Sequence, residues 1–393
     1  MPVTLGVTRL LASERLAGRR VGVICNQASV DEAFVHVADR LRGARGVTVG
    51  AIFSPQHGIG ATEQDNMIET PHGRDRARAV PVYSLYSETR EPTPEMLEGL
   101  DTLVVDLQDV GTRVYTFIYT MANALRAARR HQVPVIVCDR PNPIGSAVEG
   151  PVLQPGYESF VGQFGIPLRH GLTIGELAHV FNEHFGIGAE LEVVPMEGWL
   201  SHSYHDGTEL PWVMPSPNIP TLDTAIVYPG SVLFEGTTLS EGRGTTRPFE
   251  LLGAPGADPC ALVDALRDVG LAGVHFRPAS FVPTFQKHAG VLCGGCQIHV
   301  TDRARFRPVK TAVTLLRAFA ETAAGQFGWR PPPYEYEFEK LPIDILSGSG
   351  RLRTGIDAGI PPGTIVDGWE EETEAFRRAS RAAWLYPRTS DTP

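Results

Sequence analysis

Carboxylates beside apolar segments are the side chains of this chain most able to do chemistry. Asp106 and Asp109 stand at the end of one apolar run, Glu149 follows another, and Glu241 lies in a glycine-rich segment. Paired carboxylates cleave glycosidic bonds, because one protonates the leaving oxygen while the other acts as nucleophile or activates water. Carboxylates of this kind also cap helices or pair with arginine. The pattern therefore allows glycoside hydrolysis as one interpretation and purely structural roles as the other.

Histidines and arginines near these carboxylates could bind a polar or anionic substrate. His57 and His170 each adjoin a glycine, which fits a functional role or a structural one. Arginine binds carboxylates through two parallel hydrogen bonds. Arg140 and Arg243 are therefore candidates for binding an anionic substituent.

Motifs for several other chemistries are missing from the sequence. It has no GxxxxGK[ST] phosphate loop, no HExxH, no zinc-type Cys/His spacing and no GxSxG elbow. Cys293 and Cys296 have redox spacing, but they run into a strand-like segment rather than opening a helix that would stabilise a thiolate. We therefore expect an enzyme without metal or cofactor. The five cysteines, few and odd in number, predict reduced thiols in a cytoplasm.

Alternating strand and helix patterns in the first half must position these residues. Helical patterns at 94–100 and 116–131 lie between short apolar runs typical of strands buried on both faces. The expected strands are 21–25, 47–53, 103–107 and 133–138. Such alternation predicts an α/β fold with a doubly wound, mostly parallel sheet. Ligand sites of such sheets lie beyond the carboxyl ends of the strands, which is where the polar loops fall.

The pattern changes near residues 253–259, and this predicts a domain boundary. We expect one domain over 1–253 and a smaller α+β domain over 254–393. Its expected helices are 260–268, 309–323 and 370–383, and its expected strands are 274–277 and 297–300.

Composition excludes several classes of protein. The chain has 393 residues and a formal net charge of −10, which disfavours a general nucleic-acid binder. No run of about 18 apolar residues is present, so we expect no membrane span. The first residues lack the pattern of a secretory signal, which also favours a cytoplasmic location. The 41 glycines and 32 prolines are not periodic, and many stand in the polar loops.

Ordered sequence blocks resemble, almost end to end, the bacterial exo-β-N-acetylmuramidases. The blocks are SPQHG (54–58), PVYSLY (81–86), PTPEML (92–97), DLQDVGTRVYT (106–116), DRPNPIG (139–145), VEGP (148–151), HGLTIGELA (170–178), PWVMPSPNIPTLDTA (211–225), EGTTLSEGRGTTRPFE (235–250), PTFQKHAGVLCGG (283–295) and QIHVTDR (297–303). The resemblance implies a Rossmann-like domain, a smaller C-terminal domain and a cleft at their junction. It also implies removal of non-reducing-end N-acetylmuramic acid from peptidoglycan fragments during cell-wall turnover and recycling.

Gln56 departs from this family pattern, because many members have a glutamate there that is a leading candidate for the catalytic carboxylate. An amide cannot exchange a proton at neutral pH. Three explanations stay open: another carboxylate takes over, the 2-acetamido oxygen of the substrate attacks the anomeric carbon, or the protein binds sugar without hydrolysing it. A related glycosidase that acts on another amino or acidic sugar is a further alternative.

We expect Glu149 or Asp109 to be the general acid, Glu241 to be a further catalytic carboxylate, and His57 and Gln56 to contact the reacting sugar. Arg140 and Arg243 are the candidates for the lactyl carboxylate that distinguishes a muramic acid. The expected substrate-binding residues are Asp106, Arg113, Arg140, Asn142, His170, Ser216, Asn218 and Arg243. The expected partner is a muramyl sugar, with no nucleic acid and no membrane.

Overall fold

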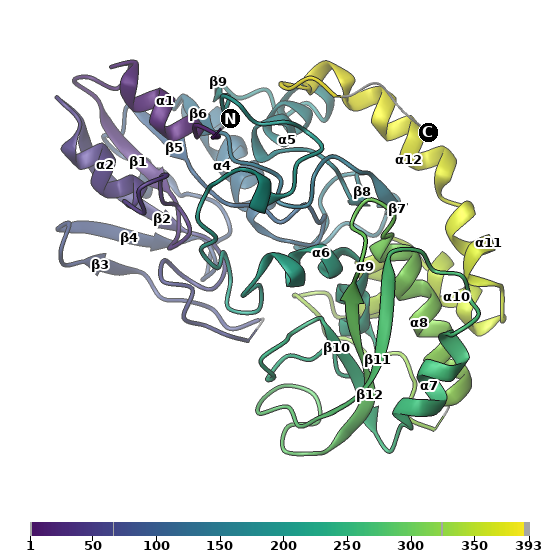
Figure 1. Ribbon diagram of the computed structural model, residues 1–393. Coiled ribbons are helices and arrows are strands. Elements are labelled where there is room, and N and C mark those ends of the chain that lie inside the picture. Colours follow the sequence, from purple (N-terminus) through teal and green to yellow (C-terminus); the bar gives the residue numbers. More distant parts are fainter. Residues whose placement is uncertain (1, 66, 324, 389–393) are drawn as a thin grey trace.

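A seven-stranded sheet forms the larger part of the computed structural model, which describes residues 2–65, 67–323 and 325–388 (Figure 1). Every pair of neighbouring strands is parallel except β3 with β4. The strands lie in the order β3 (Gly73–Asp75), β4 (Val80–Ser84), β2 (Thr48–Ser54), β1 (Arg20–Ile24), β5 (Thr102–Val105), β6 (Val135–Cys138), β9 (Leu191–Val194). The predicted α/β fold and all four predicted strands of its first half are confirmed.

Helices cover both faces of this sheet, as expected of a doubly wound fold. The apolar side chains of α1 (Gly6–Ala12) and α2 (Val37–Gly43) belong to one buried core. Those of α3 (Pro94–Leu97), α4 (Phe117–His131) and α5 (Ile174–His179) belong to a second core. The sheet is therefore buried on both sides, which explains why its central strands β1, β5 and β6 are rich in valine, isoleucine and leucine.

Threonine side chains cap the N-termini of helices α3 and α5. The Thr93 hydroxyl accepts a hydrogen bond from the Met96 amide and caps α3. Thr173 and Glu176 form a capping box at the start of α5. Helix α5 continues into a π-helical turn, η1 (Val180–His184). These caps satisfy amide groups that a helix otherwise leaves unpaired at its first turn.

A three-stranded antiparallel sheet is the centre of the smaller C-terminal part, with strand order β10 (Leu251–Pro255), β12 (Cys293–Val300), β11 (Val274–Phe281). Its helices are α7 (Pro259–Leu266), α8 (Pro308–Thr322), α9 (Pro342–Ser347), α10 (Arg351–Asp357), α11 (Pro362–Asp367) and α12 (Glu370–Ala379), followed by the 3-10 turn η4 (Ser380–Ala383). The predicted α+β character is confirmed. Cys293 and Cys296 both lie within β12 as free thiols, and their odd spacing on one strand directs them to opposite faces.

Three segments join the two parts of the molecule. Helix α6 (Leu222–Ser231) and the 3-10 turn η3 (Val232–Gly236) pack against α8 and α9, and they share one apolar core with α4. The ribbon β7 (Glu149–Val152) and β8 (Pro167–Arg169) lies beside α8 and α12. A short 3-10 turn, η2 (His205–Gly207), lies in the long connection before α6.

The end of the chain returns to the N-terminal part beyond α12, the yellow segment at the top of Figure 1. Tyr386 Oη donates to Asp139 Oδ2 at 2.5 Å, and Arg388 Nη2 donates to Glu176 Oε2 at 2.7 Å. Both carboxylates are fully buried. Within the described ranges, no helix has the length and apolar character needed to cross a membrane.

Candidate active site

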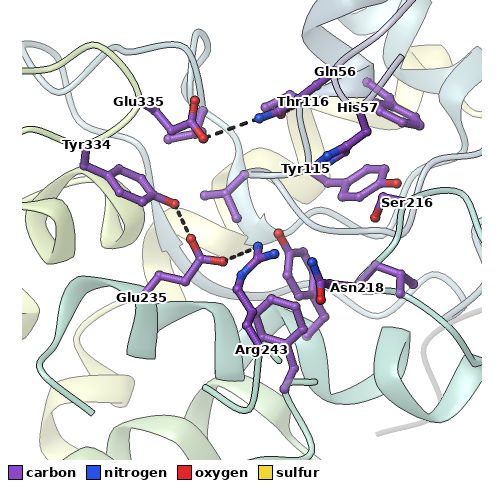
Figure 2. Close-up of a pocket in the computed structure, with 16 residues that line it drawn as sticks. Gln56, His57, Tyr115, Thr116, Ser216, Asn218, Glu235, Arg243, Tyr334 and Glu335 are labelled. Atoms are coloured by element: carbon purple, nitrogen blue, oxygen red, sulfur yellow. Dashed lines mark hydrogen bonds and ion pairs between the residues drawn. The ribbon is translucent and has the colours of Figure 1, made fainter. Parts of the chain in front are cut away.

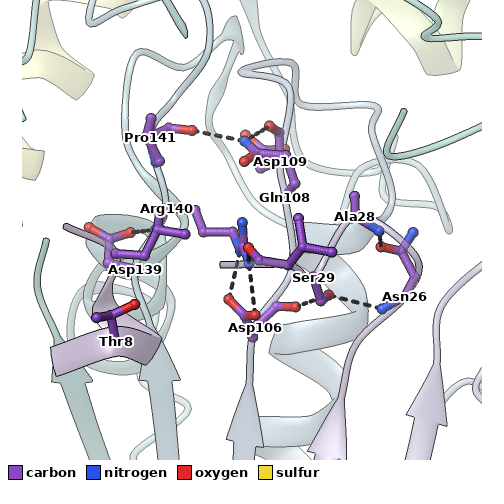
Figure 3. A network of polar contacts seen from close by, with 12 residues as sticks. Thr8, Asn26, Ala28, Ser29, Asp106, Gln108, Asp109, Asp139, Arg140 and Pro141 are labelled. Atoms are coloured by element: carbon purple, nitrogen blue, oxygen red, sulfur yellow. Dashed lines mark hydrogen bonds and ion pairs between the residues drawn. The ribbon is translucent and has the colours of Figure 1, made fainter. Parts of the chain in front are cut away.

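Ligand sites of parallel sheets lie beyond the carboxyl ends of the strands. In this protein an ion pair within the fold occupies that position. Figure 3 shows Asp106, at the end of β5, beside Arg140, which follows β6. Arg140 donates to Asp106 through Nε at 2.6 Å and Nη2 at 2.8 Å, and Nη2 also donates to the Val30 carbonyl. Ser29 donates to the Asp106 carbonyl. Asp106 and Arg140 therefore satisfy each other and hold the strand ends together.

A pocket lies near this ion pair, and both parts of the chain contribute to its wall (Figure 2). The loop after β2, the start of α4, the loop before α6 and the segments around residues 235, 243 and 335 all reach it. Its lining residues are Gln56, His57, Val114, Tyr115, Thr116, Phe117, Val161, Ser216, Asn218, Ile219, Tyr228, Glu235, Arg243, Phe249, Tyr334 and Glu335. The mixed lining of aromatic, apolar and polar side chains suits a sugar.

Glu335 is one of two buried carboxylates in this pocket. Tyr86 Oη donates to its Oε2 at 2.9 Å, and Gln56 Nε2 donates to its Oε1 at 3.4 Å. The Gln56 amide is held in this orientation because its own oxygen accepts from Thr116 Oγ1 at 2.8 Å. Burial raises the pKa of Glu335 to about 7, with a contribution from nearby Glu235 that exceeds the opposing effect of the Gln56 hydrogen bond. This carboxyl group is therefore partly protonated at neutral pH.

Glu235, the second carboxylate, has a lowered pKa, whereas the pKa of Glu335 is raised. Arg243 Nη2 donates to its Oε1 at 2.8 Å, and Tyr334 Oη donates to its Oε2 at 2.6 Å. Burial alone would raise the pKa of Glu235, but Arg243 and Tyr334 outweigh it and hold this pKa below its usual range. The pocket thus combines an ionised carboxylate with one that is partly protonated at neutral pH, and such a difference in pKa distinguishes the base from the acid in enzymes.

His57 and Asn218 present hydrogen-bond acceptors to the pocket. His57 has a φ of +71°, and its Nδ1 lies 2.6 Å from the Glu63 carbonyl, so this nitrogen carries the proton and Nε2 is the acceptor. Burial, together with Arg243, lowers the pKa of His57 to about 4, which keeps the ring neutral. Asn218 Nδ2 donates to the Gln64 carbonyl, and its oxygen is the remaining acceptor. Acceptors suit the hydroxyl and amide N–H groups of an amino sugar.

Two family models cover nearly the whole chain. The N-terminal model of exo-β-N-acetylmuramidase NamZ matches residues 21–223, and the C-terminal model matches residues 226–386. The chain belongs to the NamZ family. It is 44% identical over 388 residues to the peptidoglycan β-N-acetylmuramidase NamZ of Bacillus subtilis, covering 98% of this chain and 91% of that protein.

Solved structures of two Bacteroides fragilis proteins share the fold. Both are described as DUF1343 family proteins. One has 33% identity and a TM-score of 0.88, with 98% of this chain and 99% of that chain covered. The other has 27% identity and a TM-score of 0.76, with 99% and 100% covered. The fold of this chain is therefore shared with these two structures over nearly its whole length.

Five of the residues expected from the sequence line the pocket: Gln56, His57, Ser216, Asn218 and Arg243. Glu241 lies directly behind it, where its Oε2 accepts from Lys287 Nζ at 2.8 Å and its Oε1 lies 3.6 Å from Arg243 Nε. Residues from three sequence blocks that the chain shares with the NamZ family, SPQHG, PSPNIP and SEGRG, therefore meet at this pocket, as the sequence predicted.

The other expected carboxylates lie outside the lining. Glu149 Oε1 accepts the Lys310 amide at the start of α8, at 2.9 Å. Asp109 Oδ2 accepts the Gly111 amide at 2.7 Å and lies 3.2 Å from His170 Nε2. Both carboxylates are buried, and one oxygen of each, Asp109 Oδ1 and Glu149 Oε2, has no hydrogen-bond partner among the described residues. Their catalytic roles stay predictions that the pocket geometry does not favour.

The remaining expected substrate-binding residues are also bonded within the protein. Arg113 is fully buried and donates to the carbonyls of Pro151, Ile166 and Leu346. Asn142 donates to the Leu172 carbonyl at 2.9 Å. Together with Asp106 and Arg140, these residues hold the loops around the pocket in place. They do not belong to the residues that line it.

Glu235, Tyr334 and Glu335 are the site residues that sequence reasoning missed. Glu235 opens the EGTTLSEGRG block, and the acid at 335 stands between two tyrosines after three prolines. A rigid proline segment followed by alternating aromatic and acidic residues was the available signal. Among the described residues, no cluster of three or more His, Cys, Asp or Glu side chains could hold a metal ion.

Proposed function

We propose that this chain is an exo-acting β-N-acetylmuramidase that hydrolyses non-reducing terminal N-acetylmuramic acid from peptidoglycan fragments. The pair of buried carboxylates in one pocket, Glu235 ionised and Glu335 protonated, carries this proposal. Family membership and the activity of the Bacillus subtilis relative support it.

Glu335 acts as the general acid. Its proton passes to the glycosidic oxygen as the bond from that oxygen to the anomeric carbon breaks, so the leaving sugar departs as a neutral alcohol. Glu235 stays ionised and stabilises the positive charge that develops on the sugar ring. Water then adds its oxygen to the anomeric carbon, and the proton that this water loses restores Glu335 to its protonated form.

Gln56 orients the acid instead of replacing it. The family pattern often has a glutamate at this position, and here its amide donates to Glu335 while Thr116 fixes the amide. This arrangement favours the explanation in which another carboxylate takes over. His57 and Asn218 accept hydrogen bonds from hydroxyl and acetamido N–H groups of the sugar.

The same proposal places the reaction in a reducing compartment. All five cysteines are free thiols, and four of them are buried. Disulfides form readily in oxidising compartments and are rare in the cytosol. A cytoplasmic role in the recycling of cell-wall fragments fits this state.

Turnover of matched glycosides tests the proposal. The purified chain is expected to release N-acetylmuramic acid from a disaccharide of N-acetylmuramic acid β-linked to N-acetylglucosamine. It is expected to act far more slowly on the disaccharide of two N-acetylglucosamine units. Binding of the first disaccharide without any release would support the sugar-binding alternative, and preference for the second would support a different glycosidase.

A further inference from the structure

Arg243 has a hydrogen-bond donor that the fold does not use. Its side chain is only 9% exposed and lines the pocket. Nη2 is bonded to Glu235, and Nε lies 3.6 Å from Glu241. Nε and Nη1 are both buried and have no hydrogen-bond partner among the described residues. Figure 2 shows the guanidinium group reaching between Glu235 and Asn218.

A buried guanidinium N–H without a partner is costly, because its hydration is lost and nothing replaces it. Native proteins retain few such groups, and each calls for a reason such as a ligand. The position of this donor in the pocket wall makes a substrate atom the natural partner. Only an acceptor atom can fill this role.

The surrounding charges favour an anionic acceptor. Glu235 and Glu241 are balanced by Arg243 and Lys287, so the cluster has no excess negative charge to repel a carboxylate. Lys287 Nζ already donates to the carbonyls of Phe234 and Leu239 and to Glu241, each at 2.8 Å. Arg243 is therefore the cationic residue of the lining with an unused donor.

We infer that Arg243 binds the carboxylate of the 3-O-lactyl group and makes the pocket selective for muramic acid over other 2-acetamido sugars. The inference rests on the proposed function and names the residue that sets its substrate class. A charge-assisted N–H to carboxylate bond forms only when the lactyl acid is present. Arg140, the other arginine considered for this role, is bonded to Asp106 and lies outside the lining.

The test compares three aryl β-glycosides that share one aglycone and differ at the 3-position: free lactyl acid, lactyl carboxamide and plain hydroxyl. Arg243→Lys keeps a positive charge near Glu235 but shortens the side chain and removes Nη1. The ratio of kcat/KM for the acid to kcat/KM for the carboxamide is expected to fall at least about tenfold in this variant, the effect of one charge-assisted hydrogen bond. Arg247→Lys is the matched control, because Arg247 bonds Glu250 and does not line the pocket. Its ratio is expected to equal that of the wild type.

Binding provides a readout independent of turnover. Calorimetric titration of the Glu335→Gln protein is expected to show tighter binding of N-acetylmuramic acid than of N-acetylglucosamine, and this preference is expected to disappear when Arg243→Lys is added. An Arg243→Lys protein that loses activity equally on all three glycosides, with the binding preference intact, would overturn the inference and leave the proposed function standing. Failure of the wild type to cleave any muramide would instead count against the proposed function, while the binding preference still tests Arg243.

Discussion

Gln56 donates a hydrogen bond to Glu335 across 279 positions of sequence, from the loop after β2 to the loop that precedes α9. Tyr86, just after β4, binds the other oxygen of the same carboxylate. The acid is supplied by the C-terminal part, whereas the groups that orient it are supplied by the N-terminal part. Assembly of the site therefore requires the two parts to pack together.

The pH dependence of hydrolysis follows from the two carboxylates. Glu335 must keep its proton, so kcat/KM for a disaccharide is expected to fall as pH rises through about 7. Glu235 must be ionised, so kcat/KM is also expected to fall at low pH, below the usual range for a glutamate pKa. A pH profile of kcat/KM checks both limbs. A rate that increases through pH 7 to an alkaline plateau would contradict the assignment of Glu335 as acid.

Replacing Gln56 by Glu is expected to shift the alkaline limb of the pH profile of kcat/KM to higher pH. The amide N–H favours the ionised form of Glu335, whereas a carboxylate at this position would repel it and raise the pKa of Glu335 by about one unit or more. The pH profile of Gln56→Glu measures the shift. Gln56→Met, which removes the hydrogen bond without adding charge, is the control and is expected to shift the limb less. An unchanged limb in both variants would show that Gln56 does not influence the acid.

The Glu149→Gln variant tests which residue is the general acid: Glu335, which lines the pocket, or Glu149, which was expected from the sequence. Glu149 accepts the Lys310 amide beneath α8 and does not line the pocket. A glutamine oxygen can accept the same bond, so kcat is expected to stay within about threefold of wild type while unfolding free energy falls by about 1 kcal/mol. Steady-state kinetics and urea denaturation measure the two quantities. A folded Glu149→Gln protein without activity would restore Glu149 as the candidate acid.

Tyr386→Phe tests the role of the returning chain end. Its hydroxyl donates to fully buried Asp139, whose pKa burial raises to about 7 despite this hydrogen bond. Removal of the donor is expected to lower the unfolding free energy by about 1–3 kcal/mol, because a buried carboxylate loses a partner. Catalysis at 25 °C is expected to be unchanged, since neither residue lines the pocket. Thermal denaturation and kinetics at saturating substrate measure these effects.

Local features were predictable because nearby residues determine them. The apolar runs predicted the strands of the first half, and the helical patterns at 94–100 and 116–131 predicted helices α3 and α4. His57 and Arg243 were also found, since each stands in a glycine-rich polar loop of the resembled family. These inferences needed no knowledge of the packing between distant segments.

The acid could not be found in this way, because burial and long-range contacts create it. Glu335 gains its raised pKa from burial and from Glu235, 100 positions earlier in the chain. Asp106 shows the opposite case: it stands at a strand end, where sites are expected, yet Arg140 satisfies it. Spacing alone does not distinguish a carboxylate paired inside the fold from one exposed to substrate.

The leaving-group dependence of the Glu335→Gln variant shows whether Glu335 donates a proton to the glycosidic oxygen. An acid assists departure of a sugar alkoxide far more than departure of 4-nitrophenolate, which leaves readily without a proton. The variant is expected to lose about 10²–10⁴ in kcat/KM on the disaccharide of N-acetylmuramic acid and N-acetylglucosamine, and much less on 4-nitrophenyl β-N-acetylmuramide. Equal losses on the two substrates, or full activity on the disaccharide, would contradict the account.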